Sequence, residues 1–227
     1  MVSRREMPVY FDKSKSSRRG TKFCALTREK MQKYQRRSIR LHGYNYSQPG
    51  SYFVTICTQD KVPLLGEIVE GEMVLNNVGK VVESCWLAIP NHFANIELDK
   101  FVVMPNHIHG IIVIYPADND INDTVGVQNF EPLQNKYQHI IPKSIGSMIR
   151  AFKIGVTKWI HKNTNLHSIW QRNFYEHIIR NEPELNKIRC YIINNPAKWE
   201  FDQENRNGLP IDEKRKFWDK FLNEFSD

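Results

Sequence analysis

The chain has 227 residues, of which 41% are hydrophobic and 25% charged, and its formal net charge is +7. These proportions are ordinary for a globular protein, and no stretch approaches the ~18 consecutive apolar residues of a membrane span. The N-terminus lacks the apolar core of a secretory signal and the four cysteines form no CxxC pair, so we expect a cytoplasmic protein with reduced thiols.

The positive charge is concentrated in the N-terminal segment. Residues 1–43 contain 13 of the 32 Lys and Arg residues but 3 of the 25 Asp and Glu residues, which gives this segment a charge of +10 and the remainder −3. Such a segment attracts polyanions over a distance set by salt screening. We therefore predict a basic arm, with a solvated tail as the alternative.

The rest of the chain shows the apolar periodicities of an α+β fold. In the first half they predict a strand at 52–58, a hairpin at 64–75 turning near Glu70-Gly71, a helix capped by Asn77 and ending near residue 90, and strands at 96–104 and 108–115. After a loop at 117–137, they predict a helix at 144–162, an extended stretch at 168–180, a helix at 181–194 and a short C-terminal docking helix. An antiparallel sheet with helices on one face fits this order. We expect three regions: the arm at 1–43, a domain at 44–200 and a tail at 201–227.

Two histidines, His107 and His109, stand at the start of one predicted strand. Residues two apart in a strand point to the same face, so the two imidazoles can share a metal ion. A pair of exposed histidines without a ligand is the alternative, because this spacing often occurs by chance. The apolar runs at 101–103 and 111–114 favour the metal site, since polar groups at the centre of a sheet need a reason.

A tyrosine and an asparagine share a face of the last helix of the predicted domain. Tyr191 and Asn195 are four residues apart, so they are neighbours on the helix surface. They lie at the edge of the apolar stripe formed by Leu185, Ile188 and Ile192. Both could reach over the sheet together; a half-buried tyrosine and an ordinary helix-ending asparagine are the alternative.

The stretch at 168–180 combines aromatic side chains with cations and a histidine. Interleaved aromatic rings and positive charges suit single-stranded nucleic acid, because bases stack on the rings while phosphates need charge. A strand with packed aromatic side chains is an equally good interpretation.

Four segments, taken in order, resemble the HUH single-tyrosine transposases, and among them the group associated with repetitive extragenic palindromes (REPs). The segments are RRSIRLHGYNYSQPGSYFVTICTQ, VVMPNHIHGIIVI, WQRNFYEHIIRNEPEL and YIINNPAKW, which span about residues 36–200. The resemblance implies a ferredoxin-like or RRM-like fold, with helices packed on a central antiparallel sheet.

The resemblance also implies a chemistry. It implies His107 and His109 as ligands of Mg²⁺ or Mn²⁺, Tyr191 as the nucleophile that forms a 5′-phosphotyrosine link, and Asn195 as a third ligand where better-known relatives have Gln. Tyr175, near His177, is the competing nucleophile, but it lacks an amide four residues later. The implied protein is a nucleoid-associated monomer or homodimer that cleaves and rejoins single-stranded DNA next to hairpins.

Six basic residues are the expected DNA contacts: Arg36, Arg37, Arg40, Arg172, Arg180 and Lys198. For each of them, an ordinary solvated surface position is the alternative. Two other functions remain open, a domesticated DNA-hairpin-binding protein without catalysis and a nickase of the HUH replication or relaxase type. The intact His107, His109 and Tyr191 favour an active strand transferase.

Overall fold

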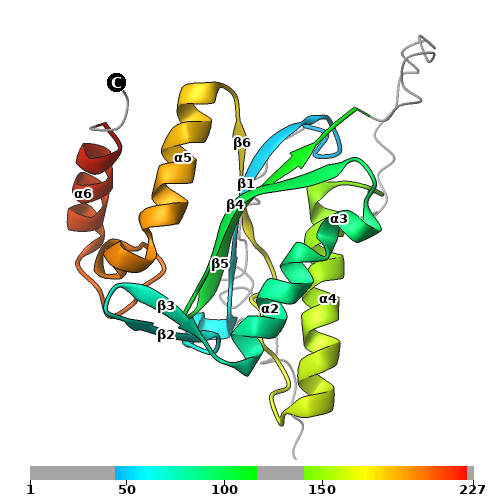
Figure 1. Ribbon diagram of the computed structural model, residues 1–227, viewed down its shortest axis with the longest axis horizontal. Coiled ribbons are helices and arrows are strands. Elements are labelled where there is room, and N and C mark those ends of the chain that lie inside the picture. The colour runs from blue at the N-terminus through cyan, green and yellow to red at the C-terminus, as the bar shows by residue number, and fades with distance from the viewer. Residues whose placement is uncertain (1–43, 117–140, 224–227) are drawn as a thin grey trace, which may run out of the picture. The chain divides into compact units, whose positions relative to one another are not determined.

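The computed structural model describes residues 44–116 and 141–223, so the predicted basic arm and the predicted loop at 117–137 lie outside the described residues. The described part is built on a four-stranded sheet with helices packed against it (Figure 1). None of its helices is both long and apolar enough to cross a membrane.

The elements follow one another much as the sequence predicts. They are β1 (Gly50–Cys57), η1 (Gln59–Lys61), β2 (Gly66–Val69), β3 (Glu72–Leu75), α2 (Asn77–Leu87), α3 (Ile89–His92), β4 (Ile96–Met104), β5 (His107–Ile114), α4 (Ile145–Asn163), β6 (Tyr175–Ile179), α5 (Glu182–Asn194), η2 (Pro196–Phe201) and α6 (Ile211–Asn223). The predicted hairpin turn is confirmed at Glu70 and Gly71, both of which have positive φ.

The strand order of the main sheet is β4-β5-β1-β6, and all neighbouring strands are antiparallel. Helix α2 connects β1 to β4 after the β2–β3 hairpin, and α4 connects β5 to β6. This is the β-α-β-β-α-β succession of the ferredoxin-like fold. The predicted fold class is therefore confirmed, with α5, η2 and α6 added after the last strand.

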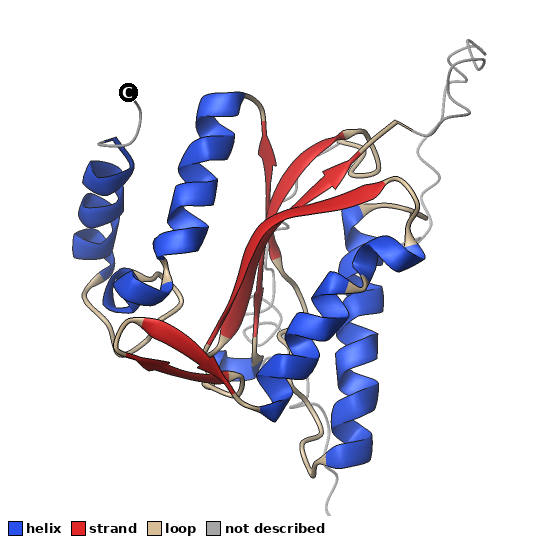
Figure 2. Ribbon diagram, viewed as in Figure 1, coloured by secondary structure: helices blue, strands red, loops and turns tan. Residues whose placement is uncertain are grey.

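Helices cover both faces of the sheet, and the prediction of helices on one face is wrong. Helices α2, α3 and α4 lie on one side of the strands, and α5 and α6 lie on the other (Figures 1 and 2). The reason is the central strand β5, in which seven of the eight residues are buried whichever way they point. A strand that is apolar on both faces needs cover on both.

The larger core lies between the sheet and the pair α2 and α4, and a smaller one lies under α5. The smaller core consists of Ile111, Ile179 and Ile192, with Leu185 and Ile188 packed against them. The predicted apolar stripe of α5 thus has its partner on the sheet face opposite to the main core.

The structure corrects the predicted N-cap of α2 and confirms that of α5. The cap of α2 is Asn76, whose Oδ1 accepts from the Gly79 amide at 3.0 Å, and not Asn77, which is the first helical residue. Asn181 caps α5 as predicted and accepts from the Glu184 amide at 2.9 Å. The Glu184 carboxylate accepts from the Arg180 amide, so it supports the residue before the cap.

Gly110 allows α2 to approach the sheet, and its replacement tests this packing. A Cβ at Gly110 would lie 2.3 Å from Cζ2 of the fully buried Trp86. We expect Gly110→Ala to lower the free energy of unfolding by about 1–3 kcal/mol, because β5 or Trp86 must shift. Urea unfolding measures the change.

The matched control is Gly155→Ala on α4, where the new Cβ would lie 3.6 Å from Cys85 Sγ, an ordinary contact. This variant is expected to be neutral or stabilising by up to ~1 kcal/mol, because alanine favours a helix interior. Equal destabilisation by both changes would contradict the packing argument.

Candidate metal and nucleophile site

The sheet register places the two histidines on the face covered by α5. Strand β1 pairs with β5 so that Thr55 lies opposite His109 and Cys57 opposite His107. The imidazole centroids of His107 and His109 are 4.2 Å apart. Thr55 Oγ1 lies 2.8 Å from Nδ1 of His109. The prediction that the two rings project together is confirmed.

Helix α5 brings Tyr191 and Asn195 over the same rings. The Tyr191 hydroxyl lies 3.1 Å from Nε2 of His109, and Asn195 is fully buried. Trp218 of α6 packs its ring against that of Tyr191 from the other side, with 4.5 Å between centroids. The helical spacing thus predicted correctly that the tyrosine and the asparagine reach the sheet together.

The centre of the site is a residue that the sequence did not indicate, Asp202. Its Oδ2 accepts from the Tyr191 hydroxyl at 2.8 Å and from Asn195 Nδ2 at 2.7 Å, and it lies 3.4 Å from His109 Nε2. Its Oδ1 accepts from the Glu204 amide at 2.6 Å and lies 3.9 Å from His107 Nε2. Asp202 follows η2 in the segment predicted as a tail, and no spacing in the sequence connects it to the histidines.

These groups fit a divalent cation. His107, His109 and Asp202 each offer a ligand atom, and these atoms lie within 4.8 Å of one another. In the described part of the chain, His107 Nε2 and Asn195 Oδ1 are buried without a hydrogen-bond partner. A buried unsatisfied polar atom costs about 1–3 kcal/mol, and two such atoms beside a buried carboxylate are what a cation would satisfy. The mixture of imidazole and oxygen donors is compatible with Mn²⁺.

The charge states of these side chains follow from their burial and from their neighbours. Burial lowers the pKa of His107 to about 3, with a further contribution from His109, so the ring is neutral at pH 7. Burial by itself would raise the pKa of Asp202, but His107, His109 and the Asn195 amide hold it well below its ordinary value. Burial, followed by the Asp202 carboxylate, raises the pKa of Tyr191 well above its ordinary value.

The site is closed to solvent. His107, Asn195 and Asp202 are fully buried and His109 is 3% exposed. Trp199 of η2 stacks on His107 with 5.9 Å between centroids. Tyr191 itself is partly exposed, whereas the groups that its hydroxyl contacts are buried.

Tyr175 lies outside this cluster of hydrogen-bonded groups. It begins β6, is 47% exposed, and contacts the ring of Phe53 edge-on at 6.3 Å. Phe53 in turn stacks on His109, with 5.3 Å between centroids. Tyr175 is thus one ring removed from His109, whereas the Tyr191 hydroxyl contacts both His109 and Asp202.

The predicted DNA contacts fall into two groups. Arg172 and Arg180 are exposed, and Lys198 is half-buried with its Nζ 5.8 Å from the centroid of the Phe217 ring. Arg36, Arg37 and Arg40 lie outside the described residues. None of the three described cations takes part in the hydrogen bonds around Asp202 that are given above.

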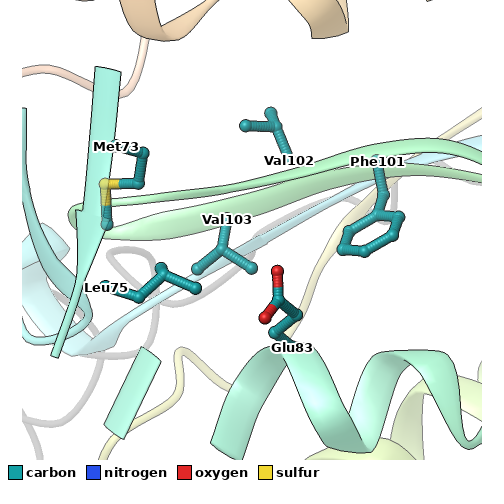
Figure 3. A pocket seen from close by; sticks show the side chains of 6 residues that line it. All are labelled: Met73, Leu75, Glu83, Phe101, Val102 and Val103. Atoms are coloured by element: carbon teal, nitrogen blue, oxygen red, sulfur yellow. The ribbon is translucent and has the colours of Figure 1, made fainter. Parts of the chain in front are cut away.

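A small pocket lies at the outer edge of the sheet, between β4, the β2–β3 hairpin and α2. It is lined by Met73, Leu75, Glu83, Phe101, Val102 and Val103, and Figure 3 shows the Glu83 carboxylate pointing toward β4. The lining contains one ionisable side chain and neither histidine nor tyrosine. This pocket therefore offers neither a nucleophile nor a cluster of metal ligands.

No protein-family model matches the sequence. An uncharacterized protein of Haemophilus influenzae is 47% identical over 174 residues, which is 75% of this chain and 93% of that protein. A second protein of Haemophilus influenzae, named "Putative REP-associated tyrosine transposase", is 25% identical over 154 residues, or 68% of this chain and 74% of that protein. This second match confirms the resemblance to the REP-associated group.

Two solved structures are also similar. A REP-associated tyrosine transposase bound to a REP hairpin has 21% identity and a TM-score of 0.47, over 71% of this chain and 74% of that one. A "putative transposase" of Deinococcus radiodurans has 16% identity and a TM-score of 0.38, over 69% of this chain and 97% of that one.

Proposed function

We propose that this chain cleaves and rejoins single-stranded DNA at the site under α5. The chain belongs to one family with the 47% identical Haemophilus influenzae protein and is related to the REP-associated tyrosine transposases. Tyr191 is the nucleophile, and His107, His109 and Asp202 hold a divalent cation, with Asn195 Oδ1 as a further ligand. The convergence of the Tyr191 hydroxyl, His109 Nε2 and Asp202 Oδ2 within hydrogen-bonding distance carries this proposal.

The reaction exchanges one phosphoester for another. The Tyr191 phenol gives up its proton and its oxygen forms a bond to phosphorus while the bond from phosphorus to the 3′ oxygen breaks, and that oxygen takes up one proton and leaves as a 3′-OH, so the exchange is proton-neutral. The 5′-phosphotyrosine keeps the energy of the phosphoester, so a second 3′-OH can attack it and release Tyr191. A bound divalent cation would neutralise the charge that builds on the phosphate and would favour the phenolate.

Asp202 orients the tyrosine but does not deprotonate it by itself. The ordinary pKa values of tyrosine and aspartate differ by about 6 units, equivalent to about 8 kcal/mol, and this environment moves them further apart. Asp202 alone therefore leaves the Tyr191 proton on the phenol oxygen, from which it is donated to Asp202 Oδ2.

The substrate follows from the chemistry of the surface and from the family. We propose hairpin-forming single-stranded DNA, with the exposed Arg172 and Arg180 and the half-buried Lys198 as phosphate contacts. We propose Arg36, Arg37 and Arg40 of the basic segment as further phosphate contacts. Contacts of this kind fix the position of the DNA backbone and carry no sequence information by themselves.

The test is a covalent adduct of defined polarity. Hairpin DNA with single-stranded flanks is labelled at either end and incubated with the full chain and Mn²⁺. A 5′-phosphotyrosine retains the downstream fragment, so the 3′-end label is expected in a protein-sized band and the 5′-end label in a short free fragment. Chelation of the metal should abolish both products.

Two results decide against the proposal. Tight hairpin binding without any adduct, in Mn²⁺ and in Mg²⁺, would indicate a DNA-binding protein without catalysis. Adduct formation on a defined duplex origin in preference to hairpins would indicate a replication or relaxase type of nickase.

A further inference from the structure

Asn106, the residue before the first histidine, is buried in the turn between β4 and β5, where it is 3% exposed. Its side chain contacts three separate parts of the chain. The amide Nδ2 donates to the carbonyl oxygen of Lys61 at 3.1 Å and to that of Glu204 at 3.0 Å, and Oδ1 lies 2.8 Å from Nδ1 of His107. Asn106 therefore joins the end of η1, the start of β5 and the loop that carries Asp202.

These contacts determine the orientation of the Asn106 amide. Two carbonyl oxygens can only accept hydrogen bonds, so the group that faces Lys61 and Glu204 must be the NH₂. The atom that faces His107 is then the amide oxygen, which can only accept. The Nδ1 of His107 must be the protonated nitrogen for this 2.8 Å contact to be a hydrogen bond.

A neutral imidazole carries one ring proton, so a proton on Nδ1 leaves Nε2 with a free lone pair. That Nε2 is the atom which faces Asp202 and has no hydrogen-bond partner among the described residues. His109 differs from His107 in this respect. Its Nδ1 partner is the hydroxyl of Thr55, which can donate or accept and so does not by itself fix the tautomer, and its Nε2 faces the Tyr191 oxygen at 3.1 Å and Asp202 Oδ2 at 3.4 Å.

Asp202 competes for the same proton. Its Oδ1 is 3.9 Å from His107 Nε2, and a small shift would allow a proton on Nε2 to be donated to this buried carboxylate. In that tautomer, His107 Nε2 and Asp202 Oδ1 would form a hydrogen bond with each other, and Nε2 would lose the lone pair that a metal ion needs. The shorter contact with Asn106 opposes it.

We propose that Asn106 is a positioning residue which holds His107 in the tautomer protonated at Nδ1 and thereby keeps Nε2 available as a metal ligand. The inference rests on the proposed metal site, but the state that it describes exists in the metal-free protein. Partners that fix the tautomer of a ligating histidine typically change metal affinity by about 10–100-fold when they are removed.

The test observes the ring nitrogens directly. The full chain is labelled with ¹⁵N at histidine and kept in chelator, and two-bond ¹H–¹⁵N spectra distinguish protonated from bare nitrogens. The His107 signals are assigned by their loss in His107→Gln. In the unaltered chain we expect a protonated Nδ1 and a bare Nε2, and a proton on Nε2 would overturn the proposal without any further variant.

Asn106→Ala removes the acceptor, and we expect the His107 proton to move to Nε2 and the Kd for Mn²⁺ to rise by about 10–100-fold. Asn106→Asp loses both donations to the carbonyl oxygens but keeps an acceptor beside Nδ1, so it should retain the original tautomer although its fold is weakened. An unchanged tautomer in a folded Asn106→Ala variant would refute the role of Asn106.

Asn205→Ala is the matched control, because Asn205 is also buried in this loop and donates Nδ2 to the Trp199 carbonyl at 3.0 Å. Its loss loosens the loop without touching His107, so the His107 tautomer should not change. A tautomer shift in this control would show that general loosening is the cause and would overturn the proposal. The spectra need no DNA, so failure of the covalent-adduct test leaves their result standing.

Discussion

Tyr191→Phe is expected to abolish the covalent DNA adduct, with a loss of roughly 10³-fold or more, the scale on which removal of a nucleophile acts. The phenol oxygen is the only atom that this change removes, and that oxygen touches both His109 and Asp202. Adduct formation is measured with 3′-end-labelled hairpin DNA in Mn²⁺. The ring of Tyr191 remains to pack against Trp218, so the variant should fold and still bind the hairpin.

Tyr175→Phe is the matched control, because it removes the same atom from the competing tyrosine. Tyr175 is 47% exposed and reaches the site only through the ring of Phe53, so its variant is expected to form adduct within about threefold of the unaltered chain. If the adduct survives Tyr191→Phe and disappears in Tyr175→Phe, the nucleophile is Tyr175. Loss of adduct in both variants would assign Tyr175 a role that the ring contact does not explain.

The second large effect is expected from Asp202→Ala. The change removes the acceptor of three donors, Asn195 Nδ2, the Glu204 amide and the Tyr191 hydroxyl, of which the hydroxyl still has His109 Nε2 at 3.1 Å. Each unsatisfied donor costs about 1–3 kcal/mol, and relaxation and the removal of a buried charge offset part of the sum. We expect the free energy of unfolding to fall by about 3 kcal/mol and the melting temperature by roughly 10 °C.

The same variant tests Asp202 as a metal ligand. A cation at 100 times its Kd stabilises a folded protein by about 2.7 kcal/mol, so Mn²⁺ should raise the melting temperature of the unaltered chain. We expect most of this rise to be lost in Asp202→Ala. Thermal unfolding with and without Mn²⁺ measures both effects.

Asp219→Ala is the control for Asp202, since Asp219 is an exposed carboxylate on α6 of the same C-terminal segment. It should change neither the stability in chelator nor the response to Mn²⁺. An equal or stronger response to Mn²⁺ in Asp202→Ala would contradict the ligand assignment. Such a result would mean that the Asp202 carboxylate fills the space that the cation needs and competes with it.

The sequence by itself determined the features that depend on local periodicity. Alternation along β5 puts His107 and His109 on one face, and the helical period of α5 puts Tyr191 beside Asn195. Both relations hold in the structure because they follow from backbone geometry, whatever the rest of the chain does. The order of strands and helices was predictable for the same reason, and it led to the correct fold class.

The tertiary structure decided the features that depend on contacts between distant segments. Asp202 is 93 residues from His109 along the chain, and it lies at the end of η2, where the chain returns to Tyr191 and Trp218 of α6 packs against the same tyrosine. The role of Asn106 required its contacts with Lys61 and Glu204, which lie 45 and 98 residues away. No periodicity encodes such distances, since they are set by which apolar surfaces bury each other. The sequence therefore determined which side chains share a face, and only the packing of the C-terminal segment decided which carboxylate completes the site.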